Sequence, residues 1–177
     1  DVILGGDGDD IINDGIGLDQ LDGGAGNDTY SRDWDLTFPD ADFVIGVDLD
    51  REGLFLVSGE DPNHREDVLV NFENVDLDGG IDSVVTGDEY ANILYTDYGD
   101  DIIYGNGGDD ILASGAGDDM VYGGEGDDTV IQNGSGTQMY DGEAGTDTFV
   151  IELENFPLPD DFVLGVDLPE NFSGPEN

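Results

Sequence analysis

The chain has 177 residues and a formal net charge of −42, because 45 aspartates and glutamates stand against three arginines and no lysine. This charge excludes nucleic acid and anionic membranes as favourable partners, and the absence of cysteine excludes disulfides and thiol chemistry. No apolar run of 18 residues occurs, so we expect no membrane insertion. So acidic a composition ordinarily predicts disorder, but 37% hydrophobic residues in regular columns predict a fold, provided that cations neutralise the carboxylates.

Residues 1–31 consist of nine-residue units in constant phase, such as GGDGDDIIN at 5–13 and GGAGNDTYS at 23–31. Aspartate occupies every sixth position and a large apolar residue every eighth position. The sixth positions are Asp1, Asp10, Asp19 and Asp28, and the eighth positions are Ile3, Ile12, Leu21 and Tyr30. Because the first unit begins at its sixth position, we expect the chain to be a segment of a longer tandem array.

Residues 32–86 lack the nonapeptide and are predicted to form an irregular β-rich spacer. Candidate strands lie at 33–38, 42–49, 53–58 and 67–77, separated by turn signals rich in proline, glycine, aspartate and asparagine. The segment holds all three arginines together with His64 and Trp34. We interpret it as irregular solenoid rungs in which arginines neutralise acidic groups locally.

Residues 87–150 form the main array. Four consecutive units read TDYGDDIIY, GNGGDDILA, SGAGDDMVY and GGEGDDTVI, each with glycine at the fourth position. Their sixth positions are Asp101, Asp110, Asp119 and Asp128, and their eighth positions are Ile103, Leu112, Val121 and Val130.

Each unit predicts a turn followed by a short strand. Glycine permits the positive-φ conformations of a tight turn, and the last three residues alternate outward, inward and outward. One unit cannot bury its single apolar side chain, so successive units must stack. Two units then make one coil of 18 residues, and the stack is an all-β structure of two parallel sheets around a thin apolar core.

Stacking brings like charges together. Equivalent turns lie about 4.8 Å apart, and two unit charges at that spacing repel by roughly 0.8 kcal/mol in water and ~3 kcal/mol at an effective dielectric of 20. A column of aspartates therefore needs cations between its members. Carboxylate and carbonyl oxygens without histidine or cysteine favour Ca²⁺, with Mg²⁺ as the weaker candidate.

These units resemble the glycine- and aspartate-rich nonapeptide GGxGxDxUx of RTX (repeats-in-toxin) proteins, the hemolysin-type calcium-binding repeat. The resemblance covers both arrays and implies a parallel β-roll, a form of β-solenoid. It also implies that Ca²⁺ lies between turns one coil apart, as for Asp10 with Asp28, Asp101 with Asp119, and Asp110 with Asp128.

Carried over residue by residue, the resemblance implies two kinds of ligand for roughly five to eight Ca²⁺ ions. The side-chain ligands are the sixth-position residues Asp1, Asp10, Asp19, Asp28, Asn92, Asp101, Asp110, Asp119, Asp128 and Asp147. The backbone ligands are turn carbonyls of Gly108, Gly115, Gly117, Gly124 and Gly126.

Three departures weaken the pattern. Asn92 replaces aspartate, and Thr137 replaces it in the unit QNGSGTQMY. A one-residue slip, which we place at Asp141, moves the last sixth-position aspartate to Asp147. Asp119 then lacks a carboxylate on its far side, which predicts a weak site there.

A longer repeat overlies the short one, because FPDADFVIGVDL at 38–49 recurs as LPDDFVLGVDL at 158–168, an offset of 119 residues. Residues 151–177 are therefore interpreted as the start of the next spacer with a frayed end, and the chain as part of a tandem of modules.

The columns have a plainer interpretation, since aspartate also favours turns without binding a metal. The constant phase over about ten units argues against it. His64 lies in a polar turn and is interpreted as a surface residue. No catalytic motif occurs, and neighbouring aspartates are turn columns rather than a general acid and base. We therefore expect no enzymatic activity.

The resemblance implies a structural module of a secreted or cell-surface protein, exported by a type I route and folded by calcium outside the cell. Two alternatives remain open. The chain could be a tandem adhesin or surface-array module that self-associates or contacts neighbouring modules. It could instead be the accessory roll of an exported protease, lipase or epimerase.

One surface is also predicted. Ninth-position residues one coil apart should share a face, which would place Tyr104, Tyr122 and Tyr140 in an exposed ladder. Such a patch on an acidic molecule would suit contact with another module, although tyrosine also simply favours strands.

Overall fold

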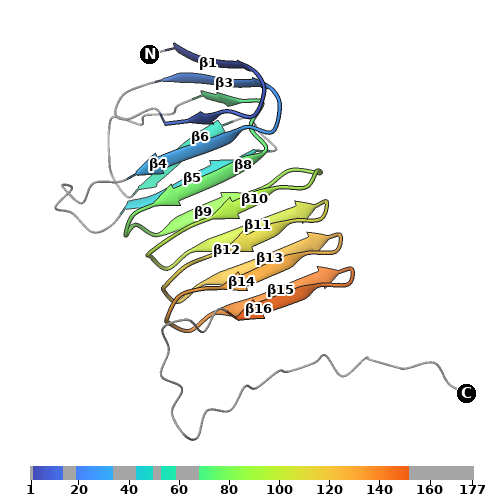
Figure 1. Ribbon diagram of the computed structural model, residues 1–177. Coiled ribbons are helices and arrows are strands. Elements are labelled where there is room, and N and C mark those ends of the chain that lie inside the picture. Colours follow the sequence, from blue (N-terminus) through green and yellow to red (C-terminus); the bar gives the residue numbers. More distant parts are fainter. Residues whose placement is uncertain (1, 14–18, 34–42, 50–52, 59–67, 152–177) are drawn as a thin grey trace, which may run out of the picture.

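The computed structural model describes residues 2–13, 19–33, 43–49, 53–58 and 68–151, which form sixteen strands and no helix (Figure 1). Within these residues no helix is available to cross a membrane. The predictions for Asp1, Trp34, His64, Arg51, Arg65 and the second spacer copy at 158–168 lie outside the described residues.

The strands form three sheets. A seven-stranded sheet has the order β16 (Thr148–Ile151), β14 (Thr129–Gln132), β12 (Ile111–Ala113), β10 (Ile93–Tyr95), β8 (Asn74–Asp78), β4 (Thr29–Asp33) and β2 (Ile11–Ile12). A six-stranded sheet has the order β15 (Met139–Ala144), β13 (Met120–Glu125), β11 (Ile102–Gly107), β9 (Ser83–Thr86), β5 (Phe43–Asp48) and β6 (Gly53–Ser58). The third sheet holds β1 (Val2–Asp7), β3 (Gln20–Ala25) and β7 (Val68–Val70).

The predicted coil of two nonapeptides is confirmed by the strand register. All strands except β6 pair in parallel, and Leu94 lies opposite Leu112 while Ile103 lies opposite Val121, each pair 18 residues apart. The turns that follow β11, β13 and β15 stack along one edge of the solenoid, on the right in Figure 1. The fold is therefore a parallel β-solenoid, as the repeat predicted.

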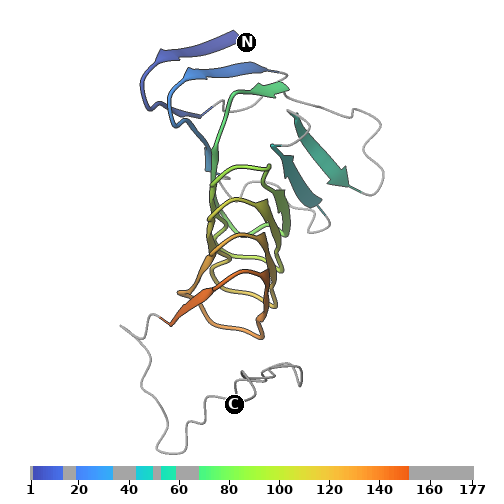
Figure 2. The same cartoon turned by 90° about the vertical axis from the view of Figure 1, so that its right-hand side faces the viewer.

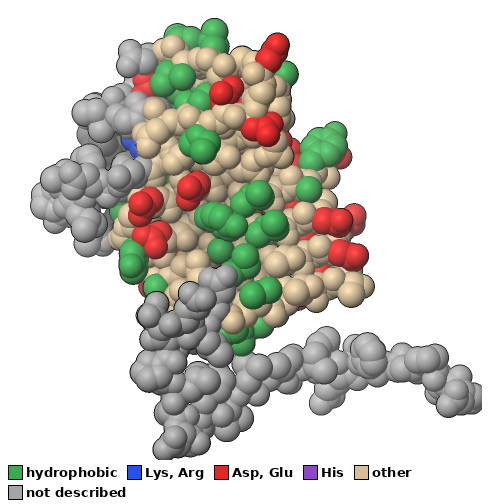
Figure 3. All heavy atoms as spheres, in the orientation of Figure 1, with side chains coloured by type: hydrophobic (Ala, Val, Ile, Leu, Met, Phe, Trp, Pro, Cys, Tyr) green, Lys and Arg blue, Asp and Glu red, His purple; other side chains and the backbone are tan. Residues whose placement is uncertain are grey.

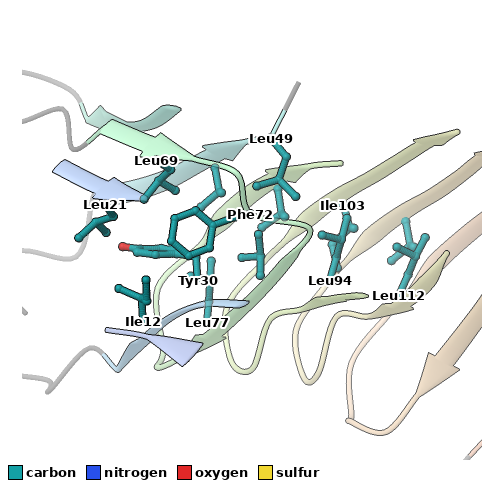
Figure 4. Close-up of a cluster of buried hydrophobic side chains, with 14 of the residues drawn as sticks. Ile12, Leu21, Tyr30, Leu49, Leu69, Phe72, Leu77, Leu94, Ile103 and Leu112 are labelled. Carbon is teal, nitrogen blue, oxygen red and sulfur yellow. The ribbon is translucent and has the colours of Figure 1, made fainter. Parts of the chain in front are cut away.

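The core is a single file of eighth-position side chains, as predicted. Leu94, Ile103, Leu112 and Val121 are completely buried, and Leu21 and Tyr30 continue the file into the first array. Figure 4 shows these side chains pointing into the space between the sheets. Each coil thus buries only one or two large side chains, so the stack has little apolar area per residue to offset its charge.

The last strands of the spacer stack directly on the first array, although the paired residues lie some 45 positions apart in sequence. Strand β4 of the first array pairs in parallel with β8, with Thr29 opposite Asn74 and Tyr30 opposite Val75. Strand β3 likewise pairs with β7, with Leu21 opposite Leu69. The seven-stranded sheet therefore continues from β2 to β16 through the spacer strand β8.

The spacer strands at 43–48 and 53–58 occur as predicted, but β6 departs from the expected rung. It pairs with β5 in antiparallel register, and β5 pairs in parallel with β9. Figure 2 shows this hairpin to one side of the stack. Its first strand still contributes to the core, since Val47 and Leu49 are buried.

The predicted slip at Asp141 is wrong, because the extra residue precedes it. Val130 lies 18 residues from its partner Leu112, whereas Met139 lies 19 residues from its partner Met120, and the Thr137 N–H already bonds a residue 19 positions earlier. The insertion therefore falls between Val130 and Thr137.

Two predictions change with that register. Gln138, rather than Thr137, becomes the sixth-position counterpart of Asp119. Tyr140 becomes an inward eighth-position residue, opposite Val121 and packed against the core. The exposed ladder is therefore a pair, Tyr104 and Tyr122, whose rings stack 5.1 Å apart, and Asp141 lies opposite Tyr122 in place of the third tyrosine.

Candidate metal centre

The sixth-position aspartates are held by hydrogen bonds between coils. The Asp110 N–H donates to Asp128 Oδ1 one coil later at 2.9 Å, and Asp110 Oδ1 accepts the Asn92 N–H at 2.7 Å. The same bond occurs between Asp10 and Asp28 (2.8 Å), Asp101 and Asp119 (3.0 Å), and Asp128 and Asp147 (3.1 Å). Each carboxylate is therefore fixed by one of its oxygens.

In five of these carboxylates the second oxygen has no hydrogen-bond partner. It is buried and unsatisfied in Asp10, Asp28, Asp101, Asp110 and Asp128. A buried carboxylate oxygen without a donor costs considerable free energy. Its recurrence at equivalent positions indicates that the fold reserves this oxygen for a ligand that is not part of the chain.

The first-position glycine leaves room beside that oxygen. A Cβ added at Gly105 would overlap both Asp110 Oδ2 and the carbonyl oxygen of Gly123, the first residue of the next coil on that edge. The unpartnered carboxylate oxygen and the neighbouring carbonyl therefore face the same small space. Glycine is required at this position because any side chain would fill the space.

Burial also shifts the titration of these groups. Burial, followed by the charges of neighbouring carboxylates, raises the pKa of Asp110 to about 6. Burial likewise raises the pKa of Asp101 to about 6, against opposing hydrogen bonds from Thr96 and Ser83. The pKa of Asp119 and that of Asp128 are raised by burial as well. The calcium-free fold thus disfavours the negative charge that its sequence places there.

On the opposite edge of the solenoid, the carboxylates of Asp101 and Asp119 accept hydrogen bonds from other residue types. Asp101 Oδ1 accepts the Ser83 N–H at 2.7 Å, so a serine takes the sixth position before Asp101. Asp119 Oδ2 accepts a hydrogen bond from the Ser114 hydroxyl at 2.9 Å, and Gln138 also bonds the Asp119 side chain. Asp119 is therefore supplied with donors by the chain itself, and the weak site predicted there stays a prediction.

The predicted glycine ligands lie where the backbones of successive turns approach most closely. A Cβ at Gly124 would overlap the Asn106 carbonyl, and one at Gly126, whose φ is +137°, would overlap the Gly108 carbonyl. Gly115 and Gly117 make equally close approaches to the carbonyls of the preceding coil, at residues 97 and 99. The turn carbonyls therefore line the columns, and their coordination of Ca²⁺ stays a prediction.

The fifth-position aspartates do not share this environment. Asp109 Oδ1 accepts the Asp127 N–H at 2.9 Å, and Asp100 Oδ1 accepts the Asp118 N–H at the same distance, with all four residues exposed. They link successive turns from the solvent side. Their carboxylates are therefore solvated and lie apart from the buried column.

The residues present fit a hard divalent cation. Within the described residues no three histidine, cysteine, aspartate or glutamate side chains converge on one point, so each step supplies at most two carboxylates. The remaining ligands must be carbonyl oxygens and water, a set that Ca²⁺ accepts in irregular geometry. Asp110, Asp128 and the Gly123 carbonyl would hold such an ion, which would neutralise the column.

The nonapeptide motif did not identify the sixth-position residues Glu73, Ser83 and Gln138, because they are not aspartates. The structure places Glu73 in the column between Asp28 and Asn92, since the Asp28 N–H donates to Glu73 Oε2 at 2.7 Å. A signal existed, because the buried Val75 follows Glu73 by two residues, as each eighth position follows its sixth. The predicted ligand Asp19 is buried, and Asp147 is exposed at the last coil.

The amide of Asn92 is engaged within the protein. Its Oδ1 accepts the Asp88 N–H at 2.9 Å, and its Nδ2 donates to the Glu73 carbonyl at 2.8 Å. The ligand role predicted for Asn92 stays a prediction.

Comparison with known proteins agrees with this geometry. A family model described as the RTX calcium-binding nonapeptide repeat (four copies) matches the chain over residues 1–30, 86–121 and 95–130. No curated protein matches the chain. The matched segments cover the first array and the main array as far as residue 130, where the turns carry the buried, unpartnered aspartates, and the chain therefore carries the RTX calcium-binding nonapeptide repeat in a parallel β-solenoid.

Proposed function

We propose that the chain is a structural module that folds when it binds Ca²⁺, in a protein that is exported before it folds. The calcium-free chain would stay expanded where Ca²⁺ is scarce, through repulsion among its acidic residues. Millimolar Ca²⁺ outside the cell would neutralise the turn columns and stabilise the solenoid by mass action, by about 2.7 kcal/mol for each site at a hundredfold excess over its Kd. Its role would be structural and not enzymatic.

The unpartnered oxygen of the sixth-position aspartates supports this proposal above all. Five carboxylates each bury one oxygen that has no donor, in a molecule of net charge −42. The thin core offers little apolar burial to offset that cost. A bound cation would supply a partner to each buried oxygen and would neutralise the repulsion between carboxylates. Folding and Ca²⁺ binding should therefore be one event.

The test is to follow folding during calcium titration. In millimolar Ca²⁺ the chain should show a β-type circular dichroism spectrum and a compact radius by small-angle scattering. In excess chelator both should revert to those of an expanded chain. An equal concentration of Mg²⁺ controls for screening by ionic strength. A spectrum that is unchanged in excess chelator would refute calcium-coupled folding.

A tandem assembly module is the second candidate, and the exposed apolar surface favours it. Figure 3 shows hydrophobic side chains gathered in the middle of one face, with acidic side chains along the right-hand edge. Tyr104 and Tyr122 stack on an exposed strand face, and Ile93 and Tyr95 are also exposed. Sedimentation in Ca²⁺ tests this role, because replacing both tyrosines by threonine should keep the solenoid folded and abolish any association.

A further inference from the structure

We propose that Asp28, Glu73 and the carbonyl of Asn71 form a further Ca²⁺ site, which takes two of its ligands from outside the nonapeptides and joins the spacer to the first array. This inference rests on the proposed calcium binding of the repeats. The matched repeat segments end at residue 30 and resume at residue 86, so the motif does not include Asn71 or Glu73.

Strand register places these residues in the roles of a nonapeptide turn. Asp22 lies opposite Val70 and Thr29 lies opposite Asn74. Asn71 therefore stacks on Gly23, a first-position residue, and Glu73 stacks on Asp28, a sixth-position residue. The spacer imitates the next turn of the array.

The hydrogen bond that fixes each sixth-position carboxylate recurs at this step. The Asp10 N–H donates to Asp28 Oδ1 at 2.8 Å, and the Asp28 N–H donates to Glu73 Oε2 at 2.7 Å. Glu73 thus reaches back toward the preceding coil as Asp28 does, and one carboxylate oxygen of each residue is fixed in the same way.

The space beside Asp28 is also the same as at the other steps. A Cβ at Gly23 would overlap the Asn71 carbonyl oxygen and lie 2.8 Å from Asp28 Oδ2. At the preceding step, a Cβ at Gly5 would overlap the Gly23 carbonyl and lie 2.7 Å from Asp10 Oδ2. The Asn71 carbonyl therefore takes the place of a glycine carbonyl.

An independent observation indicates a ligand. Asp28 is fully buried, at 0% exposure, and its Oδ2 has no hydrogen-bond partner. That oxygen faces the Asn71 carbonyl, another acceptor, and the Glu73 carboxylate is held to the same backbone. Oxygen acceptors gathered at a buried carboxylate oxygen that has no donor favour a bound cation.

The turn from Asn71 to Glu73 is three residues shorter than the turn from Gly23 to Asp28. Glu73 still occupies the sixth position, and its carboxylate accepts the Asp28 N–H. Phe72, between them, is buried and packs edge-on against Tyr30, with ring centroids 6.1 Å apart (Figure 4). This contact fixes the shorter turn in place.

Solvent reaches the site, and the column of carboxylates ends at Glu73. Asn71, Phe72, Glu73 and Asp88 line a hollow of about 280 Å³, which brings solvent to the Glu73 side of the site. On the other side of Glu73, the Asn92 amide donates to the Glu73 carbonyl at 2.8 Å. An amide thus bridges the next step, so Asp28–Glu73 is the last carboxylate pair of the first array.

The oxygen-only donor set identifies the class of ion. Two carboxylates and a backbone carbonyl suit Ca²⁺, which tolerates irregular geometry and completes its shell with water, better than Mg²⁺, which demands an octahedron. The site would connect, through one ion, residues 45 positions apart in the sequence.

Glu73→Gln tests the site, because it retains an oxygen for the Asp28 N–H and removes the charge. The full chain and its variants are compared for bound Ca²⁺ by equilibrium dialysis at saturating Ca²⁺, with circular dichroism to monitor the fold. Glu73→Gln should bind one ion fewer than the wild type. Glu125→Gln, which removes an exposed charge, should bind the wild-type number, and Asp110→Asn should lose an ion at a nonapeptide step.

The outcomes separate this inference from the proposed function. If the wild type binds no Ca²⁺, the proposed function fails. If Asp110→Asn loses an ion and Glu73→Gln loses none, only the junction site is refuted. Crystals of the wild type in Ca²⁺ give a second measurement that does not depend on a variant folding. Anomalous density between Asp28 and Glu73 would support the site, and density at Asp110–Asp128 without density there would overturn it.

Discussion

At the scale of single residues, the two carboxylate oxygens of each sixth-position aspartate have different roles. One oxygen of Asp110 accepts a backbone N–H from the preceding coil, and the other stays buried without a partner beside Gly105 and the Gly123 carbonyl. Asparagine could make the first contact but would carry no charge to an ion. The turn therefore needs both the carboxylate and the glycine opposite it.

Two glycines in one turn allow a matched test of that space. At Gly105 a Cβ would overlap Asp110 Oδ2 and the Gly123 carbonyl, whereas at Gly107 the nearest atom would be 3.7 Å away. Gly105→Ala should remove the ion between Asp110 and Asp128 and raise the Ca²⁺ concentration needed for folding. Gly107→Ala should titrate like the wild type, since neither position has a positive φ. Equal calcium midpoints for the two variants, followed by circular dichroism, would contradict this account of the space.

At the scale of elements, the chain terminates its calcium columns with neutral donors. Gln138 takes the sixth position in the turn before β15, and its Nε2 donates to the Gly115 carbonyl at 3.3 Å. Gln138 also bonds Asp119, whose other donor is the Ser114 hydroxyl. At this step an amide supplies what an ion would supply at a column of aspartates, so the β13–β15 connection does not depend on Ca²⁺ on that edge.

Gln138→Glu tests this substitution by restoring a second carboxylate. Without Ca²⁺, the variant should be less stable, by up to ~3 kcal/mol for two charges at one strand spacing. With saturating Ca²⁺, it should bind one ion more than the wild type, as counted by equilibrium dialysis. Gln20→Glu adds the same charge at an exposed position of β3 and serves as the control. If both variants bind equally many ions, Gln138 does not replace an ion.

At the scale of the whole molecule, protons and Ca²⁺ compete for the same carboxylates. Burial raises the pKa of Asp101 and of Asp110 to about 6, well above the 3.8 of an ordinary aspartate. Neighbouring carboxylates add to this rise, and hydrogen bonds to each carboxylate offset part of it. The folded state therefore binds protons more tightly than the unfolded state. Protonation stabilises the calcium-free fold below pH 4, and this contribution is lost as the pH rises through about 6.

This linkage predicts that acid partly substitutes for Ca²⁺. In chelator, β-type circular dichroism should be stronger at pH 5 than at pH 7.5, because protonated carboxyls no longer repel one another. The midpoint of Ca²⁺ binding to the acid-stabilised fold, followed by equilibrium dialysis, should lie at higher Ca²⁺ at pH 5 than at pH 7.5, since protons must leave before the ion binds. A calcium midpoint that is the same at both pH values would contradict the competition.

The sequence alone determined the repeating parts of this protein. A constant nine-residue phase fixes which side chains face inward, because each strand alternates with period two, and the buried Leu94, Ile103 and Leu112 lie where that phase puts them. The acidic sixth positions likewise follow from the repeat. Such local periodicity is legible without a structure because every coil contacts only its neighbours.

Only the tertiary structure shows where side chains lie at the points where the nine-residue phase is interrupted. Glu73 joins the column only because β7 and β8 pair with strands of the first array some 45 residues earlier, a contact that no local pattern encodes. The insertion before Thr137 could fall anywhere in a glycine-rich turn, and only strand pairing shows that it turns Tyr140 inward and brings Gln138 to Asp119. A one-residue change of register reverses every side chain on a strand, so these positions depend on pairing between strands and not on the residues themselves.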